Sequence, residues 1–419
     1  MIVLKKNYRY SSTPLVCIDG EVRDSGSRNV IICVNSVQYT YTLNNGHFKA
    51  FIHLNQVVNN VLIKGDHSEN SRLEKIIYKQ RTSKNFVRLV YLICPNDKGL
   101  YDGSFQAPAE EDASLASALS RISVGAMLAQ YFYSETLPNN KTFNLELNDE
   151  MEPRVHVLTL SKTKDELFTM SQHDIWEYVA KELLSSYLAD SRCKYLAFCA
   201  FTRYTFSTKK SLCDLKYEDY LRMTKGFVSL GGGGLALVGT QCLYTWPTSV
   251  SKIIKCFSND QSVDIFKFMN DSCNRGTLGG CFATTLGSAI HELGHTFDLG
   301  HSDKGIMDKH FHFIDELFKG NKDKQKYKWW NQCTMQILSN HKWFNEFEDK
   351  TDDRSAICLL DDYVKSQYGI IVIEYRDRVN SRTISYSTYS LPKKIVKLSN
   401  NNNCSIVVMD SFGNILKSD

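Results

Sequence analysis

Apolar and polar positions divide the chain into two outer regions that predict strands and a central region that predicts strands alternating with helices. In residues 1–85, short apolar runs are separated by turn signals such as Asp19-Gly20 and Asn45-Gly46. The runs cover residues 15–18, 30–35, 47–54 and 57–63. Short, regularly spaced strands broken by turns predict a small antiparallel β-sandwich, which we expect to be an accessory domain.

The pattern changes near residue 86. Nearly continuous apolar runs predict buried strands, and apolar positions spaced three and four apart predict amphipathic helices. The expected strands are residues 87–94, 155–160 and 195–201, and the expected helices are residues 110–135, 174–188, 282–297, 310–318 and 326–343. We expect Thr284 or Thr285 to cap the helix over residues 282–297. This alternation predicts an α+β or α/β fold in which helices pack on a mixed sheet.

Strands return at the end of the chain. Residues 345–355 are dense in Asp, Glu and Lys and form a candidate linker. After them, residues 369–375, 382–390, 394–398 and 404–410 predict strands, with a turn at Gly413-Asn414. We therefore predict a β-sandwich domain over residues 1–85, a mixed domain over residues 86–345 and a C-terminal β-rich domain over residues 356–419.

A glycine run stands out within the central region. Gly231 to Gly234 precede the apolar residues 235–243. Such a run can suggest a phosphate-binding loop, but no Lys-Ser or Lys-Thr pair follows it. We expect instead a flexible bend that leads into a strand over residues 235–243.

Composition removes several classes of function. The 419 residues carry a net charge of +4 and no long basic run, which does not favour nucleic acid as a partner. No window approaches the roughly 18 unbroken apolar residues of a membrane span. Residues 1–14 lack the apolar core of a signal peptide, and the 13 cysteines include no C-x-x-C pair. These features favour a cytoplasmic protein with reduced thiols, and they leave the oligomeric state open.

The candidate chemistry lies in His291-Glu-Leu-Gly-His-Thr-Phe-Asp-Leu-Gly-His301. On a helix, His291 and His295 project from one face, separated by about 6 Å of rise, which lets two imidazoles reach one metal ion. Glu292 is turned too far round the helix to bind that ion, but it can contact a water bound to it. His301 becomes a third ligand if the chain turns back sharply. Three imidazoles leave a fourth tetrahedral position open, as in catalytic zinc sites, so we expect one Zn²⁺ per chain.

A simpler explanation is that the three histidines only fill the core or a helix surface. For any single histidine we prefer that explanation. For the ordered set, followed by Gly305-Ile306-Met307, we prefer the zinc site.

These residues resemble the metzincin clan of zinc proteases, with Met307 in the place of its Met-turn. Further segments are similar to an uncharacterised zinc-metallopeptidase family of fungi and arthropods that is sometimes placed beside the matrixins. The segments are residues 45–50, residues 230–239, Trp246-Pro247 and Gly305-Ile306-Met307. The resemblance covers about residues 10–320. It implies a metzincin-like zincin domain, with a mixed sheet and an active-site helix, flanked by the two β domains.

The resemblance also implies roles for other residues. Met307 would form an apolar floor beneath the metal without binding it. The strand over residues 235–243 resembles the edge strand on which matrixins lay an extended peptide, so Gly232, Gly233, Gly234 and Leu235 are candidate substrate-binding residues.

One residue departs from the metzincin pattern. Asp298 stands where the clan has the glycine at which the chain turns towards its third ligand. Because Asp is among the few residues other than Gly that adopt positive φ, we expect the turn to survive.

We therefore predict a zinc metalloendopeptidase that hydrolyses peptide or protein substrates through a zinc-bound water activated by Glu292. The alternative is a catalytically inactive binding protein that keeps zinc as a structural element. A third hypothesis, carbohydrate binding by the C-terminal region, depends only on its β pattern.

Overall fold

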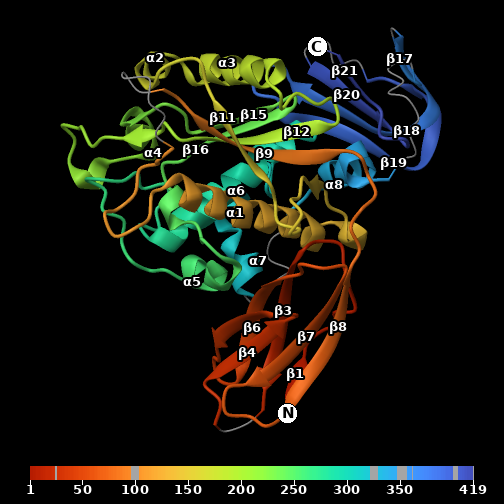
Figure 1. Cartoon of the computed structure of the whole chain (residues 1–419). Coiled ribbons are helices and arrows are strands. Elements are labelled where there is room, and N and C mark those ends of the chain that lie inside the picture. Colours follow the sequence, from red (N-terminus) through yellow and green to blue (C-terminus); the bar gives the residue numbers. More distant parts are fainter. Residues whose placement is uncertain are drawn as a thin grey trace.

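Three groups of strands follow one another along the chain in the computed structural model (Figure 1). The structure describes residues 1–23, 26–95, 103–320, 329–346, 356–360, 362–399 and 404–418. The N-terminal strands lie below the central sheet in Figure 1, and the C-terminal strands lie at its upper right. Multiple sheets combined with helices confirm the predicted mixed α+β class.

The N-terminal strands form two sheets. One has the order β1 (Ile2–Leu4), β3 (Leu15–Val22), β6 (His47–His53). The other has the order β2 (Tyr10–Ser11), β8 (Ser71–Tyr78), β7 (Val58–Gly65), β4 (Asn29–Val34), β5 (Val37–Thr42). Buried and more exposed positions alternate along β4 and β7, as one-sided strands require. All four expected strands are present as β3, β4, β6 and β7. The additional strands are β1, β2, β5 and β8, and the β2–β8 pair is parallel.

The central sheet has the order β10, β9, β12, β16, β15, and β11 also pairs with β9. These strands are β9 (Phe86–Ile93), β10 (Asn144–Leu145), β11 (Val155–Thr159), β12 (Cys193–Cys199), β15 (Ser229–Gly232) and β16 (Leu235–Gly239). All pairs are parallel except the antiparallel pair β15–β16. Parallel strands covered on both faces have few positions that contact water, which explains why β9 and β12 are apolar except for Arg88 and Lys194.

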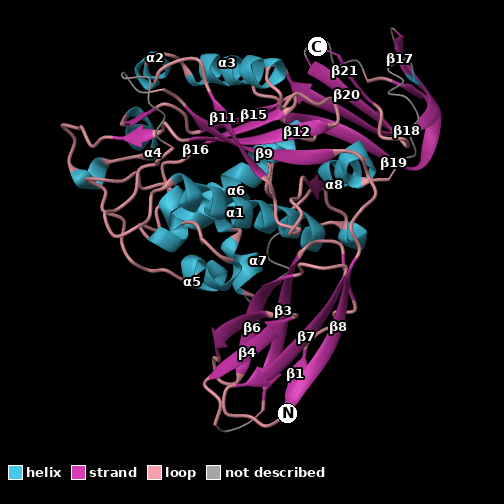
Figure 2. Ribbon diagram, viewed as in Figure 1, coloured by secondary structure: helices cyan, strands magenta, loops and turns pink. Residues whose placement is uncertain are grey.

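Helices cover both faces of this sheet (Figure 2). Side chains of α1 (Leu115–Thr136) and α6 (Leu278–Thr296) share one buried cluster with alternate residues of β9, β12 and β16. Side chains of α3 (Gln172–Ser185) share the other cluster with the intervening residues. The remaining α-helices are α2 (Lys164–Phe168), α4 (Tyr217–Arg222), α5 (Ile253–Phe257), α7 (Asp315–Lys319) and α8 (Gln332–Asn340).

The 3-10 turns and one small sheet complete the central region. The turns are η1 (Pro138–Asn140), η2 (Leu212–Asp214), η3 (Leu243–Thr245), η4 (Val250–Lys252), η5 (Lys309–Phe313) and η6 (Lys342–Phe344), and the small sheet pairs β13 (Arg203–Tyr204) with β14 (Thr224–Lys225). The expected helix over 310–318 is therefore η5 followed by α7. Of the helix expected over 326–343, residues 326–328 lie outside the described part and α8 occupies the middle.

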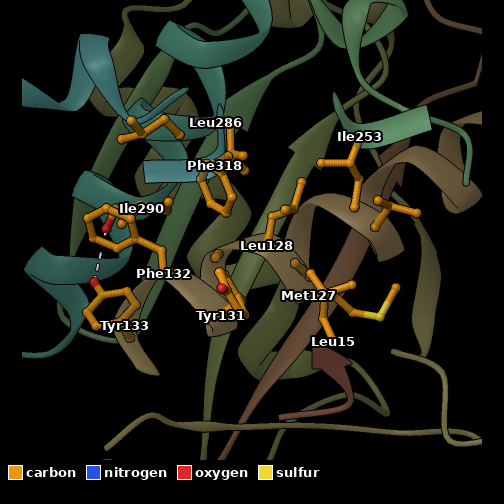
Figure 3. Close-up of a cluster of buried hydrophobic side chains, with 14 of the residues drawn as sticks. Leu15, Met127, Leu128, Tyr131, Phe132, Tyr133, Ile253, Leu286, Ile290 and Phe318 are labelled. Atoms are coloured by element: carbon orange, nitrogen blue, oxygen red, sulfur yellow. Dashed lines mark hydrogen bonds between the residues drawn. The ribbon is translucent and has the colours of Figure 1, made fainter. Parts of the chain in front are cut away.

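Helix α1 connects the N-terminal strands to α6 (Figure 3). Met127, Leu128 and Tyr131 pack close to Leu15 of β3 in the buried cluster. On the adjoining face, the Tyr133 hydroxyl donates to the Ile290 carbonyl in α6 at 3.1 Å. The residue after Ile290 is His291, so this buried contact fixes α6 at the start of the histidine motif.

The C-terminal sheet has the order β17 (Ile357–Leu360), β18 (Tyr363–Asp377), β20 (Cys404–Asp410), β21 (Ile415–Ser418), and β19 (Thr383–Lys397) also pairs with β18. The strands expected over 382–390 and 394–398 form one long strand, β19. Of the candidate linker at 345–355, only residues 345 and 346 are described.

The predicted edge strand over residues 235–243 is wrong in position. Strand β16 ends at Gly239 and has partners on both sides, β12 and β15. Among the described strands, β15 pairs only with β16, so the edge of the sheet is Ser229–Gly232.

Among the described helices, none is both long and apolar enough to cross a membrane.

Candidate metal centre

Helix α6 begins earlier than the sequence predicts. The Thr277 side chain caps it by accepting a hydrogen bond from the Gly280 amide at 3.1 Å. The expected caps, Thr284 and Thr285, lie inside the helix, so that prediction is wrong. A Cβ on Gly279 would lie 2.7 Å from the Phe257 carbonyl oxygen. The glycines that resemble a loop in the sequence therefore allow close packing of the first helical turn.

The side chains of His291, His295 and His301 converge. One ligand atom from each lies within 4.8 Å of the others. The ring centroids are separated by 4.8 Å for His291 and His295, 5.3 Å for His291 and His301, and 4.7 Å for His295 and His301. His291 is buried and the other two are half-buried. The structure thus brings together the three residues that the sequence singles out as metal ligands.

Hydrogen bonds fix which nitrogen of each ring faces inward. Nδ1 of His291 lies 2.7 Å from the Ile306 carbonyl, Nδ1 of His295 lies 2.9 Å from the Leu299 carbonyl, and Nδ1 of His301 lies 2.8 Å from the Asn380 carbonyl. A carbonyl only accepts, so each Nδ1 carries the proton in a neutral ring and each Nε2 offers a lone pair.

Two of these lone pairs face each other. The Nε2 atoms of His291 and His295 are 3.1 Å apart. Burial lowers the pKa of His291 to about 4 and that of His295 to about 3, so neither ring is protonated at neutral pH. Converging lone pairs in a buried site are stabilised by a cation that both nitrogens can bind. The donor set therefore fits a metal that prefers imidazole nitrogen, such as zinc.

The turn after α6 is a Schellman motif with Asp298 in the left-handed position. Asp298 has a φ of +66°. The Asp298 amide donates to the His295 carbonyl and the Leu299 amide donates to the Gly294 carbonyl, both at 3.1 Å. Asp298 thus adopts positive φ, and the chain reverses here towards His301.

The carboxylate of Asp298 has a role that the sequence did not suggest. It accepts a hydrogen bond from His341 Nε2 at 3.1 Å and forms an ion pair with Lys417 Nζ at 2.6 Å. Burial alone would raise the pKa of Asp298, but the His341 hydrogen bond and the charges of Lys417 and Lys194 hold it well below its usual range. Asp298 therefore joins the end of α6 to the strand β21.

Glu292 lies on α6 beside the sheet edge. It is only 8% exposed, and burial raises its pKa to about 7 against the opposing effect of hydrogen bonds from the Ser229 hydroxyl and the Gly231 amide. A buried carboxyl with a pKa near neutrality is suited to take up and release a proton. The contacts with Ser229 and Gly231 place this carboxyl at β15.

Close packing of β15 on α6 depends on Gly231. A Cβ at this position would lie 2.3 Å from the Glu292 carbonyl oxygen and 2.8 Å from its Cα. We expect Gly231→Ala to lower the free energy of unfolding by about 1–3 kcal/mol, measured by chemical denaturation, because backbone atoms cannot move aside cheaply. Gly234→Ala is the matched control, since a Cβ there would meet nothing within 4 Å and should change stability by less than about 0.5 kcal/mol. Equal effects of the two changes would contradict this account.

Met307 lies in the turn after His301. The turn is closed by a 3.1 Å hydrogen bond from the Ser302 amide to the Met307 carbonyl, with Gly305 at a φ of +84°. The Met307 side chain is 1% exposed, and its sulfur would lie 2.5 Å from a Cβ added to Gly294. It therefore packs against α6 at the glycine that precedes His295.

The residues expected to bind substrate form the turn between β15 and β16. Gly232 ends β15, Gly233 and Gly234 are exposed in the turn, and Gly233 has a φ of +53°. Leu235 begins β16 and is only 3% exposed. Its side chain belongs to the buried cluster beneath α3. A contact between Leu235 and substrate would therefore involve its backbone, and the substrate role of these four residues stays a prediction.

Comparisons with known proteins point to one class of enzyme. Residues 4–358 match the family Metallopep, described as "Putative peptidase family". A protein of Schizosaccharomyces pombe named "Putative zinc metalloproteinase" is 23% identical over 303 residues, covering 67% of this chain and 46% of that protein. A protein of Saccharomyces cerevisiae with the same description is 23% identical over 314 residues, covering 67% of this chain and 43% of that protein. The chain thus spans less than half the length of these two relatives.

Among solved structures, OgpA from Akkermansia muciniphila resembles this chain at a TM-score of 0.46 and 12% identity, over 81% of this chain and 92% of that one. That OgpA is a catalytically inactive form in complex with an O-glycopeptide substrate. Wild-type OgpA matches with the same TM-score and 14% identity. At this TM-score the likeness carries no argument about function.

Proposed function

We propose that this chain, which belongs to the putative peptidase family Metallopep, is a zinc-dependent endopeptidase of the metzincin type. The observation that carries the proposal is the set of three imidazoles with inward-facing lone pairs, beside a buried carboxyl whose pKa is raised to about 7. The relatives named as zinc metalloproteinases support zinc as the metal.

His291, His295 and His301 would hold one zinc ion per chain through their Nε2 atoms. A bound zinc ion would supply Lewis acidity, which polarises a scissile carbonyl and makes a nearby water more acidic. Glu292 takes the proton of the attacking water and gives it to the departing amine. Ser229 and Gly231 orient the Glu292 carboxyl. Met307 packs beneath the site without binding the metal.

The peptide or protein substrate would lie extended along β15. This strand is at the end of the central sheet, and an extended peptide can add to such an edge through main-chain hydrogen bonds. Gly232, Gly233, Gly234 and the backbone of Leu235 would line the end of this edge, where the absence of side chains on the glycines permits close approach.

We also retain the division into domains over residues 1–85, 86–345 and 356–419. The sheets support it, because no described strand of one region pairs within the sheet of another. The largest buried cluster runs from Ile2 to Met409, however, so these regions pack on one another extensively. The boundaries therefore mark sheets more than independent folding units.

Metal analysis and peptide cleavage by the purified chain test the proposal. We expect about one zinc per chain by mass spectrometry, and cleavage of a peptide library that a chelator abolishes and added zinc restores. Stoichiometric zinc without any cleavage would favour the alternative, a catalytically inactive zinc-containing binding protein. Absence of zinc binding would contradict both.

A further inference from the structure

The third histidine is held by the C-terminal sheet. Strands β18 and β19 are joined by residues 378–382, and His301 forms an isolated parallel bridge with Arg382 in this turn. The His301 amide donates to the Ser381 carbonyl at 3.1 Å, and the Thr383 amide donates to the His301 carbonyl at 2.8 Å. The His301 backbone is therefore paired on both its donor and its acceptor with the β18–β19 hairpin.

The hairpin also supplies the hydrogen bond to the His301 ring. The Nδ1 partners of His291 and His295 are carbonyls 15 and 4 residues away, within the motif and its turn. The Nδ1 partner of His301 is the Asn380 carbonyl, 79 residues later. Asn380 lies beyond residue 358, where the match to the peptidase family ends.

The turn that presents this carbonyl is built from its own hydrogen bonds. The Asp377 carboxylate accepts from the amides of Val379 at 2.9 Å and Asn380 at 3.0 Å. The Asn380 side chain accepts from the Arg382 amide at 2.9 Å, and Ser381 takes a φ of +54°. These bonds fix the conformation of the turn and so the direction of the Asn380 carbonyl.

The hairpin and the histidine loop are also in close steric contact. A Cβ on Gly300 would lie 2.6 Å from both the Ser381 carbonyl oxygen and Arg376 Nε. Arg376 donates to the Asp298 carbonyl at 2.6 Å, and Arg382 donates to the Ser302 carbonyl at 3.2 Å. The loop from Asp298 to Ser302 is therefore held at several points by residues of the C-terminal sheet and its β18–β19 hairpin.

We propose that the β18–β19 hairpin contributes to metal binding by orienting His301. The Asn380 carbonyl holds His301 in the tautomer and orientation that present Nε2 to the metal, so metal affinity depends on the C-terminal sheet. Partners of this kind commonly change metal affinity by about 10- to 100-fold. The inference rests on the proposed zinc site, and Asn380 is a positioning residue that does not touch the metal.

The first test shortens the hairpin. Replacing residues 378–381 with Asn-Gly preserves the strands through a two-residue turn but removes the carbonyls of Asn380 and Ser381. We expect the Kd for zinc, measured by competition with a chromophoric chelator, to rise about 10- to 100-fold. Gly300→Ala would place a methyl group against the Ser381 carbonyl from the side of the His301 loop. It should therefore also raise the Kd for zinc. Val379→Ala is the control, because this tip side chain is 95% exposed and should leave the Kd unchanged.

Cobalt spectra and hydrogen exchange give readouts independent of activity. The visible spectrum of bound Co²⁺ should change in the shortened chain as the contribution of His301 is lost. In the native chain, added zinc should slow amide exchange in residues 377–383 as well as in α6. This last measurement needs no variant, so it decides the matter even if both variants fail to fold.

The outcomes are separable. Folded variants that bind zinc within about twofold of the native Kd, or native exchange in residues 377–383 that ignores zinc, would overturn the role of the hairpin. A native chain that binds no zinc would instead overturn the proposed function.

Discussion

Replacing Glu292 with Gln should leave zinc bound and slow peptide hydrolysis by about 100- to 10,000-fold. The amide keeps the size of the carboxyl and can still contact Ser229, but it cannot accept the proton of the attacking water. The three histidines and their carbonyl partners are untouched, so the metal should be retained at one equivalent per chain. Turnover of a cleaved peptide and metal content, measured on the same preparation, check both halves of the prediction.

A matched control is available on α3. Glu177 is half exposed, and among the described residues its carboxylate lies near His173 and Lys181 of its own helix. Glu177→Gln should therefore leave turnover unchanged. Loss of zinc in Glu292→Gln would point to a structural role for this carboxyl, and turnover within about threefold of native would remove it from the mechanism.

The pH dependence of hydrolysis should follow the protonation of Glu292. Glu292 must be ionised to accept a proton, and burial raises its pKa to about 7. A bound cation favours the carboxylate and lowers that pKa. We therefore expect hydrolysis to decline as pH falls below the pKa of the loaded enzyme.

The local parts of this site could be predicted from the sequence because they depend on residues close together in the chain. A spacing of four places His291 and His295 on one helix face in any sequence that forms a helix. The left-handed conformation of Asp298 is likewise a property of a single residue and its helix end. Long apolar runs similarly identify β9 and β12, since buried parallel strands need no polar positions.

The errors arise where distant segments decide the outcome. Gly279 and Gly280 suggest a loop, yet both lie in the first turn of α6, where a Cβ on Gly279 would clash with the carbonyl oxygens of Phe257 and Asn259. The edge of the sheet lies at β15, because four residues pair antiparallel with β16 across the glycine turn. The bond from His301 to Asn380 spans 79 residues, and no local pattern in the sequence encodes it.

Asp298 depends both on its own backbone conformation and on contacts with residues far along the chain. Substitutions of Asp298 should separate these two contributions to stability. Its backbone needs a residue that tolerates positive φ, whereas its carboxylate is bound by His341 and Lys417. Asn keeps the backbone and one acceptor, Gly keeps only the backbone, and Ala keeps neither. We therefore expect the free energy of unfolding to fall in the order native, Asn, Gly, Ala.

The expected loss for Asp298→Ala is about 3 kcal/mol, and the loss for Asp298→Gly is about 1 kcal/mol smaller, because Ala also strains the left-handed position. Both substitutions destabilise the chain because the buried Lys194 and the half-exposed Lys417 lose their counter-charge. Denaturant unfolding with a chelator present measures these values without any contribution from metal binding.

The stability contributed by the Asp298 carboxylate should depend on pH. The pKa of Asp298 is depressed in the folded chain, so its stabilisation is complete above the unfolded value of about 4 and is lost as pH falls below it. The stability difference between the native chain and Asp298→Asn should therefore stay constant from about pH 7 to 5 and shrink below about pH 4. If Asp298→Gly proved as stable as the native chain at pH 7, the carboxylate would contribute nothing, and Asp298 would serve only as a residue that tolerates the turn towards His301.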